Sequence, residues 1–461
     1  MRVSSPRAAL FWPFVLAMSW AGAAHAEPLC QPLPQALPAV QELHYVSDYP
    51  NDDLAVDYYR WDDYCYGGAP LKWKEWRESN DWDLGSITLT RRLDYYRPSN
   101  LPLSQPLPLV IYAHPGGQSE DFRETQPGDK LPHVHSLLMK VLAAGYAFAT
   151  IESRHPLASF VVQRPPGHDK PGWPQPTTTP VPSNDIATAV RWIKFNRDTF
   201  VINPDQIMLV GQSRGSAALL NALLNEAGDP KATDWHSQSS VVKGAFVYQA
   251  QTSYLETEIA PVFVKETGDN GELYRYWFLQ DSPDVIIKPK LNIPGSAVQV
   301  ARATPRNQLV PVHMAYDHDM VLQPDGVTIQ PQCYETNNEN RAEQEFDDDD
   351  NPDTNPPKTE VKDMPRCPHD ADHPKQVFDV HDANFSQFFA QAYADQKVAN
   401  RFTRCMAVGV EVNGKIDDRL SVEAAYAEVV PFVRRVLNDQ LFFTSCPKGG
   451  HYVPPPPPGH F

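Results

Sequence analysis

The chain has 461 residues, 41% of them hydrophobic, so it is long enough for one large domain with insertions or for two ordinary domains. Its 57 acidic side chains outnumber its 40 basic ones and give a formal net charge of −17 at neutral pH. This excess of negative charge argues against nucleic acids and anionic membranes as partners, and it makes acidic polymers poor substrates.

The first 26 residues have the pattern of a secretory signal peptide. Arg2 and Arg7 precede an apolar stretch over residues 8–23, and residues 24–26 (AHA) supply the small side chains that signal peptidase recognises. Cleavage after Ala26 removes two positive charges, which changes the net charge from −17 to −19. We expect a secreted or periplasmic protein, with an uncleaved membrane anchor as the alternative.

Six cysteines follow this segment, and an even number in an exported chain predicts three disulfides. We expect each cysteine to pair with its nearest neighbour in sequence. That pairing would tie down the amino-terminal segment, clamp a long insertion and pin the carboxyl-terminal tail to a strand. The expected pairs are Cys30–Cys65, Cys333–Cys367 and Cys405–Cys446. The residues before Cys30 are not those of a lipoprotein signal, so no lipid anchor is expected.

Apolar runs typical of buried strands alternate with amphipathic helical patterns along much of the chain. An alternating pattern over 86–96 predicts a half-buried antiparallel strand, and the run over 109–113 predicts a strand covered on both faces. The pattern then predicts helices over 137–144, 185–195, 385–398 and 421–437, and strands over 146–151, 206–210, 243–248, 310–316 and 402–408. This order predicts an α/β fold with a doubly wound, mainly parallel sheet.

The remaining segments lack this alternation. Residues 27–84 show no clear periodicity and are expected to be irregular. Residues 321–376 are acidic and rich in asparagine and proline, which favours a solvated insertion. Residues 446–461 are a proline-rich tail, and its polyproline-like part, 453–458, is expected to be mobile. We therefore assign residues 85–445 to a single domain that carries the insertion.

The most informative stretch is residues 206–220, QIMLVGQSRGSAALL. An apolar run typical of a buried strand stops at Gly211, and small residues and leucines at helical spacing follow Gly215. The spacing G-x-S-x-G places Ser213 on a sharp strand-to-helix turn, because glycines let the two elements pass closely. The serine hydroxyl would then point into open space above a sheet. The alternative is a glycine-flanked turn with an incidental serine.

With these elements in this order, the chain resembles the α/β-hydrolases, particularly secreted carboxylesterases with an HGGG-type loop. The matching pieces are residues 114–117 (HPGG), the strand that ends at 152–154 (ESR), the segment 185–207, and the turn at Ser213. The resemblance covers residues 85–320 and continues over 376–437. It implies lids over 160–182 and 261–277, and no cofactor. It does not identify the substrate.

The resemblance also implies an oxyanion hole, that is, a set of N–H donors around the oxygen that becomes negative when serine attacks an ester. Gly116 and Gly117 can place such donors, since glycine permits positive φ and close approach. The N–H of Arg214, the residue after the nucleophile, would complete the hole.

A serine nucleophile needs a base and a carboxylate that orients the base, and the order implied by the resemblance is serine, acid, histidine. The resemblance implies Asp319 as the acid, because its place after the strand over 312–316 and before an apolar pair is similar to the family's pattern. Asp317, nearer the strand end, is the alternative.

The resemblance implies a histidine between the strand over 402–408 and the final helix. The chain departs from the family here, because residues 409–421 contain no histidine. His451 is our first candidate, since a Cys405–Cys446 disulfide would bring it beside the last strand. His381 is the second candidate. His318, His313 or the absence of any base complete the alternatives.

Two clusters have the residue types of metal sites. Cys367, His369 and His373 have a spacing that zinc could use, but an exported Cys367 is expected to be disulfide-bonded. Residues 347–353 could hold calcium through carboxylate oxygens, although a solvated acidic loop explains them as well. We expect no metal in the site.

These observations predict a secreted serine hydrolase that cleaves a carboxylic ester through an acyl-enzyme on Ser213. The expected substrate is a small-molecule or polymeric ester, with no nucleic acid or membrane partner. A serine peptidase or an extracellular polyester depolymerase would use the same residues. A catalytically inactive binding protein is the alternative from another class, because the expected histidine is missing.

Overall fold

We describe the chain from a computed structural model of all 461 residues. The structure describes residues 33–38, 43–46, 55–65, 92–115, 132–153, 181–223, 229–252, 297–317, 383–406, 408, 411–412, 415–416, 418–440, 446 and 450–457. The expected signal peptide, both disulfides that involve Cys30 or Cys333, the acidic insertion and nearly all of the two lids lie outside these residues.

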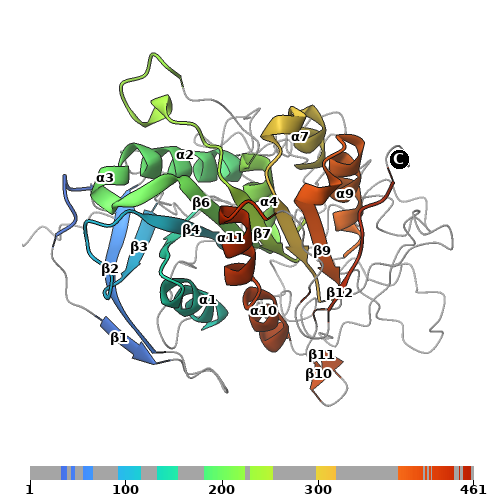
Figure 1. The fold of residues 1–461 in the computed structure, drawn as a ribbon, viewed down its shortest axis with the longest axis horizontal. Helices are drawn as coiled ribbons and strands as arrows, with labels where there is room; N and C mark the ends of the chain where they lie inside the picture. The colour runs from blue at the N-terminus through green and yellow to red at the C-terminus, as the bar shows by residue number, and fades with distance from the viewer. Residues whose placement is uncertain are drawn as a thin grey trace, which may run out of the picture.

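A ten-stranded sheet runs through the molecule in the order β1-β2-β3-β5-β4-β6-β7-β8-β9-β12 (Figure 1). Its strands are β1 (Leu43–Val46), β2 (Ala55–Cys65), β3 (Arg92–Pro98), β4 (Leu107–Ala113), β5 (Ala147–Ile151), β6 (Ile202–Gln212), β7 (Gly244–Tyr248), β8 (Val312–Ala315), β9 (Phe402–Met406) and β12 (His451–Tyr452). The neighbouring strands from β5 to β9 in this order are parallel, whereas β1, β2, β3 and β12 pair antiparallel. A mainly parallel sheet of an α/β protein is therefore confirmed.

Helices cover both faces of the sheet (Figure 1). They are α1 (Pro132–Ala143), α2 (Val181–Phe195), α3 (Arg197–Phe200), α4 (Ser213–Ala222), α7 (Ala297–Ala303), α9 (Phe385–Asp395), α10 (Asp418–Tyr426) and α11 (Val429–Leu437). Single 3₁₀ turns are η2 (Trp235–Ser237), η4 (Arg306–Gln308) and η6 (Ala399–Arg401), and β10 (Glu411–Val412) pairs with β11 (Lys415–Ile416) as a separate hairpin. The helices α2, α4, α7 and α9 pack on one face, and α1, α10 and α11 pack on the other.

The central strands are apolar along their length because both of their faces are covered. In β4, Leu109 and Ile111 belong to the core under α2 and α4, while Val110 and Tyr112 belong to the core under α1 and α10. The continuous apolar run over 109–113 therefore follows from burial on two sides rather than one.

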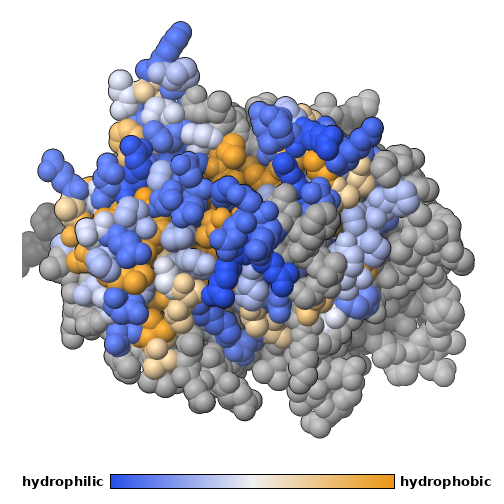
Figure 2. Space-filling model, viewed as in Figure 1, coloured by the Kyte–Doolittle hydropathy of each residue, from blue (hydrophilic) through white to orange (hydrophobic). Residues whose placement is uncertain are grey.

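Helix α11 shows how the outer layer is attached. It buries Val429, Phe432, Val433 and Val436 against the sheet, and its last turn carries Arg434 and Arg435. In Figure 2 the surface around this helix, near the centre of the view, is largely hydrophilic. Its apolar stripe thus provides the packing and its charged side faces water.

Three elements differ from the sequence prediction. The amino-terminal segment, expected to be irregular, contributes β1 and β2, and the aromatic side chains of β2 pack on β3. Strand β3 is buried on both faces rather than one, since Leu93 and Tyr95 belong to one apolar core and Tyr96 belongs to the other. The single helix expected over 421–437 is two helices, α10 and α11. Pro431 lies in the first turn of α11, where its missing N–H is tolerated, and it could not continue a preceding helix.

The carboxyl-terminal tail is pinned to a strand of the sheet, as the predicted Cys405–Cys446 pair implied. Its strand β12 pairs with β9, matching His451 with Met406 and Tyr452 with Cys405. Cys405 and Cys446 form a disulfide with a Cα–Cα distance of 5.5 Å, so this predicted pair is confirmed. Cys65 is also disulfide-bonded. Among the described residues, no helix is long and apolar enough to cross a membrane.

Candidate active site

Ser213 occupies a strained turn between β6 and α4. Gln212 is extended, with φ −129° and ψ 144°, and Ser213, the first residue of the helix, has φ 52°. A residue with a side chain avoids this left-handed region at a cost of about 1–2 kcal/mol, so the surrounding contacts must impose it. The serine is 8% exposed. The sharp strand-to-helix turn expected at this serine is present.

The two glycines of the motif explain why the turn can form. A Cβ on Gly215 would lie 2.3 Å from the carbonyl oxygen of His114 and 2.5 Å from that of Ala113. A Cβ on Gly211 would lie 3.1 Å from the N of Ser216. The absence of a side chain at Gly215 therefore lets the elbow rest directly on the carboxyl end of β4, and Gly211 lets the helix start close to the strand.

Buried tyrosines support the turn from the side of α10. The hydroxyl of Tyr426 lies 3.4 Å from Oε1 of Gln212, the residue before the serine, and 3.4 Å from the hydroxyl of Tyr112. Burial raises the pKa of both phenols well above the usual value, so each stays neutral and can donate. Ser216 in the first turn of α4 donates to the carbonyl of Tyr248 at 3.3 Å, which ties the helix to β7.

His114 connects the ends of β4 and β5 beside this turn. Its Nε2 accepts a hydrogen bond from the backbone N–H of Ser153 at 3.2 Å, so the neutral ring carries its proton on Nδ1. Nδ1 lies 3.0 Å from the carbonyl oxygen of Pro115 and donates to it. Because both ring nitrogens hold backbone groups, His114 shapes the loop that follows β4.

Of the three expected oxyanion donors, one belongs to the described residues. Gly116 and Gly117 lie outside them, directly after the described Pro115. Arg214 is in the first turn of α4, where helices leave the N–H groups without intrahelical acceptors, and the preceding Gln212 makes no side-chain cap. The N–H of Arg214 therefore lies at a helix amino terminus, where the helix itself supplies no acceptor for it.

The strand after His114 also ends in a fixed polar group. Glu152, buried at the end of β5, accepts two hydrogen bonds from Arg92, from Nε at 2.8 Å and from Nη2 at 3.2 Å. This bidentate pair joins β3 and β5. The carboxylate of Glu152 is paired with Arg92, so its role is to link β3 to the carboxyl end of β5.

Of the two candidate acids, Asp317 is described and Asp319 lies outside the described residues. Asp317 comes two residues after β8 and is 2% exposed. Its Oδ2 accepts a hydrogen bond of 2.8 Å from Nε2 of Gln249, which directly follows β7. Both strands end at the same edge of the sheet as β6, so this carboxylate lies on the side of the sheet where Ser213 lies.

His451 lies at the same edge, but farther along it. It is exposed and begins β12, opposite the last residue of β9. Four strand spacings separate β12 from β6 in the sheet order, which corresponds to about 19 Å. The disulfide does bring His451 beside the last parallel strand as expected, yet at this distance from the strand that carries Ser213.

The other candidate bases divide between a core residue and positions outside the described residues. His313 lies within β8, stacked on Phe246 with ring centroids 4.9 Å apart, and Nδ1 lies 2.9 Å from Oγ1 of Thr403. Burial, together with the charge of Arg435, lowers its pKa to about 3. His313 is thus a neutral packing residue. His318 and His381 lie outside the described residues.

The segment that carries His451 is fixed by Arg404, a buried residue of β9. Its guanidinium donates to the carbonyls of Val453 at 3.2 Å and Pro454 at 2.8 Å, and to Oε1 of Gln387 on α9 at 2.7 Å. Gln391 of α9 donates to the carbonyl of Pro457 at 3.0 Å. Residues 453–457 belong to no helix or strand, so their carbonyls are available to such donors.

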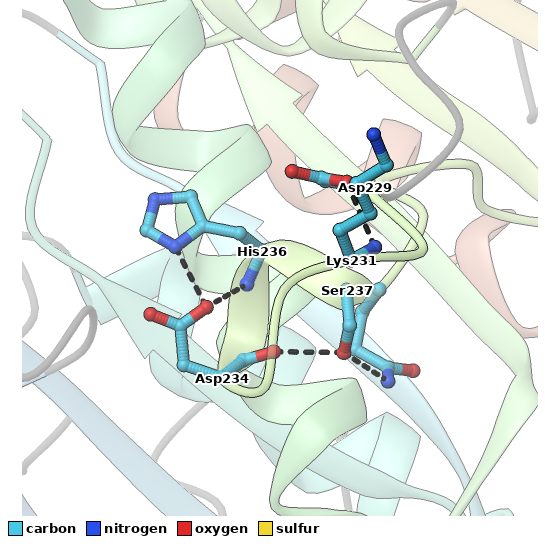
Figure 3. Close-up of polar contacts among 6 residues, drawn as sticks. Asp229, Lys231, Asp234, His236 and Ser237 are labelled. Atoms are coloured by element: carbon cyan, nitrogen blue, oxygen red, sulfur yellow. Dashed lines mark hydrogen bonds and ion pairs between the residues drawn. The ribbon is translucent and has the colours of Figure 1, made fainter.

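The described residues contain another histidine–carboxylate pair, on the loop that enters β7 (Figure 3). Nδ1 of His236 lies 2.8 Å from Oδ1 of Asp234, which also accepts the N–H of His236 at 3.0 Å. These hydrogen bonds lower the pKa of the exposed Asp234 carboxyl. The pair precedes β7 and therefore lies at the amino edge of the sheet, opposite Ser213. It closes a surface turn.

No group of three or more histidine, cysteine or acidic side chains with the arrangement of a metal site occurs in the described part of the chain. The residues considered for zinc (Cys367, His369 and His373) and for calcium (347–353) lie outside it.

Sequence reasoning missed Gln249, Tyr426 and Arg404. The first carries a weak signal, because a polar residue directly after a buried strand lies at the edge where such sites form. Tyr426 and Arg404 carry none, since each contacts residues far away in the sequence.

No family model matches the chain, and no curated protein matches it. Among solved structures, a fungal esterase from Rhizomucor miehei is similar over 83% of this chain and 85% of its own, with 13% identity and a TM-score of 0.40. An acetyl ester-xyloside bifunctional hydrolase from Caldicellulosiruptor lactoaceticus is similar over 53% of this chain and 74% of its own, with 18% identity and a TM-score of 0.32. Esterase B from Lactobacillus rhamnosis shows 13% identity over 56% of this chain and 66% of its own, with a TM-score of 0.32. All three TM-scores are below 0.5.

Proposed function

We propose that this protein is an exported α/β-hydrolase in which Ser213 cleaves a carboxylic ester. The observation that carries the proposal is the turn itself: a serine at φ 52° between a parallel strand and a helix, with Gly215 against the carbonyls of Ala113 and His114. Strain of this kind persists where the surrounding structure imposes it, and it is common at active sites.

The reaction follows from this placement. Oγ of Ser213 attacks the ester carbonyl carbon while a histidine accepts the hydroxyl proton. The N–H of Arg214, with donors from Gly116 and Gly117, stabilises the resulting oxyanion. The C–O bond to the alcohol then breaks, and the histidine returns the proton to the departing oxygen. Water, deprotonated by the same histidine, then attacks the acyl carbon; the bond to Oγ breaks, the histidine returns the proton to Ser213, and the acid is released.

The proposal is tested with a fluorophosphonate probe and a chromogenic short-chain ester. The purified protein should take up one probe per chain and hydrolyse the ester, and Ser213→Ala should lose labelling and at least about 10³-fold in kcat/KM. Ser237→Ala, which changes an exposed-loop serine at the opposite edge of the sheet, is the matched control and should behave as the unchanged protein. Folded protein that is not labelled would favour the catalytically inactive binding protein instead.

More than one histidine is a candidate for the base. His451 remains the first prediction from sequence, but its position in β12, about 19 Å from β6 along the sheet, counts against direct contact with Ser213. Separate His451→Gln, His381→Gln and His318→Gln variants would assign the role. The base should be the one whose loss lowers kcat/KM by about 10³-fold or more.

A further inference from the structure

We propose that Gln249 is a positioning residue of this site, which holds Asp317 in the orientation needed to align the base for Ser213. This inference rests on the function proposed above, and it assigns the role of the acid to Asp317 rather than Asp319.

The register of the sheet places Gln249 next to the nucleophile. Strands β6 and β7 are parallel, and Gln212 pairs with Tyr248. The next residue of each strand is therefore Ser213 on one and Gln249 on the other. Neighbouring parallel strands lie about 4.8 Å apart, so these two residues stand side by side at the edge of the sheet.

Both residues share an unusual backbone conformation. Five described residues other than glycine have positive φ. Three of them, Val201, Lys397 and Asp439, follow helices α3, α9 and α11, where a left-handed residue commonly ends a helix. The other two are Ser213, with φ 52°, and Gln249, with φ 51°, and neither ends a helix. The two strained residues that do not end a helix therefore lie side by side, at the carboxyl ends of β6 and β7.

The conformation of Gln249 directs it toward Asp317. Its backbone N–H donates to the carbonyl of Ala315, the last residue of β8, at 2.9 Å. Its side-chain Nε2 donates to Oδ2 of Asp317 at 2.8 Å, and the two residues are 7% and 2% exposed. Backbone and side chain therefore hold the same turn. A buried carboxylate with one oxygen fixed by an amide has little freedom to rotate.

The spacing suits a histidine between Asp317 and Ser213. Strands β6 and β8 are separated by β7, so the residues after them are about 10 Å apart along the sheet. One imidazole with a hydrogen bond at each nitrogen, together with the serine and aspartate side chains, spans that distance. Oδ2 is held by Gln249, and Oδ1 would orient the imidazole and stabilise its protonated form.

Two substitutions of Gln249 test this role in the full-length protein, using ester hydrolysis as the readout. Gln249→Met keeps the length of the side chain and removes the donor, and it should lower kcat about 10-fold with KM changed less than 2-fold. Gln249→Glu places a second carboxyl group beside Asp317. Its added negative charge should favour the protonated base and move the acidic limb of the kcat/KM profile at least about half a pH unit higher.

The matched controls are Gln238→Met and Gln238→Glu, because Nε2 of Gln238 donates to Ser237 at 3.1 Å in the loop at the opposite edge. They should leave kcat and the pH profile unchanged. A merely structural Gln249 would lower stability without moving the acidic limb, and that result would overturn the proposal. Thermal unfolding of each variant separates loss of fold from loss of orientation.

The acid assignment is tested by Asp317→Asn beside Asp319→Asn. We expect Asp317→Asn to lower kcat/KM by about 10³ to 10⁴-fold, because the histidine would adopt the wrong tautomer. If Asp319→Asn causes that loss while Asp317→Asn is nearly neutral, the assignment is wrong. These outcomes presuppose an active parent whose activity disappears in Ser213→Ala. An inactive parent would instead contradict the proposed function.

Discussion

The turn at Ser213 and the carboxyl-terminal segment beside β9 lie at the same edge of the sheet, yet they are held there differently. The turn is fixed by the close contact of Gly215 with the end of β4 and by the hydrogen bonds of Tyr426 with Gln212 and of Ser216 with Tyr248. The segment 450–457 is fixed by a disulfide, a two-residue strand and the guanidinium of Arg404. The nucleophile is thus held by close packing among the central strands, whereas His451 is held at the edge strand β12 by a disulfide and by the hydrogen bonds of Arg404.

The largest effect is expected at the turn. Gly215→Ala would place a Cβ 2.3 Å from the carbonyl oxygen of His114, so β4 and α4 would have to separate. We expect a loss of about 3 kcal/mol or more in the free energy of unfolding and about 10²-fold or more in kcat/KM. Denaturant unfolding and ester turnover measure these two changes.

Gly145→Ala is the control for that substitution. Gly145 has φ 82°, but its Cβ would meet only Leu101 Cδ1, at 3.8 Å. It should cost about 1–2 kcal/mol from backbone strain and leave activity intact. Equal losses in the two variants would show that the contact with His114 is unimportant.

The second effect concerns the disulfide. Cys405 and Cys446 are 41 residues apart, and the double substitution to serine should lower the free energy of unfolding by about 2–4 kcal/mol, as measured with urea. Ester turnover of this double variant, measured well below its unfolding temperature, tests whether the attachment of His451 matters for activity. If His451 is the base, turnover should fall with the loss of the disulfide. If the base lies elsewhere, turnover should persist.

The smallest effect is a pH dependence in the carboxyl-terminal half of the sheet. Burial keeps His313 neutral with a pKa of about 3, compared with 6.5 for a free histidine. Between these values the unfolded chain binds a proton that the folded protein excludes. Stability that is present above pH 6.5 is therefore lost as the pH falls, by up to about 1.4 kcal/mol per pH unit.

The variant His313→Leu should abolish this part of the slope, as measured by thermal unfolding between pH 7 and pH 5. The control is His236→Leu, which removes an exposed histidine at the other edge of the sheet. An unchanged slope in His313→Leu would assign the acid sensitivity to other groups.

Much of the sheet could be predicted because burial on two faces leaves a continuous apolar run, as in β4, β5 and β7. The strands β1 and β2 could not, because their segment lacks a clear periodicity and is ordered by pairing with β3. The helix break before Pro431 was visible in the sequence, but the apolar period over 421–437 suggested a single helix.

For the site, the sequence by itself determined the turn at Ser213, since the requirement for small residues on both sides of the serine is local to five positions. It led us to expect the Cys405–Cys446 pair, but the order of six cysteines does not select one pairing, and the tertiary structure decided it. The tertiary structure decided what stands beside these residues. Gln249 meets Asp317 across 68 positions, and Arg404 meets Pro454 across 50, because the register of parallel strands and the path of the carboxyl-terminal segment bring them together. Such contacts have no local sequence pattern, since they depend on where two separate elements end.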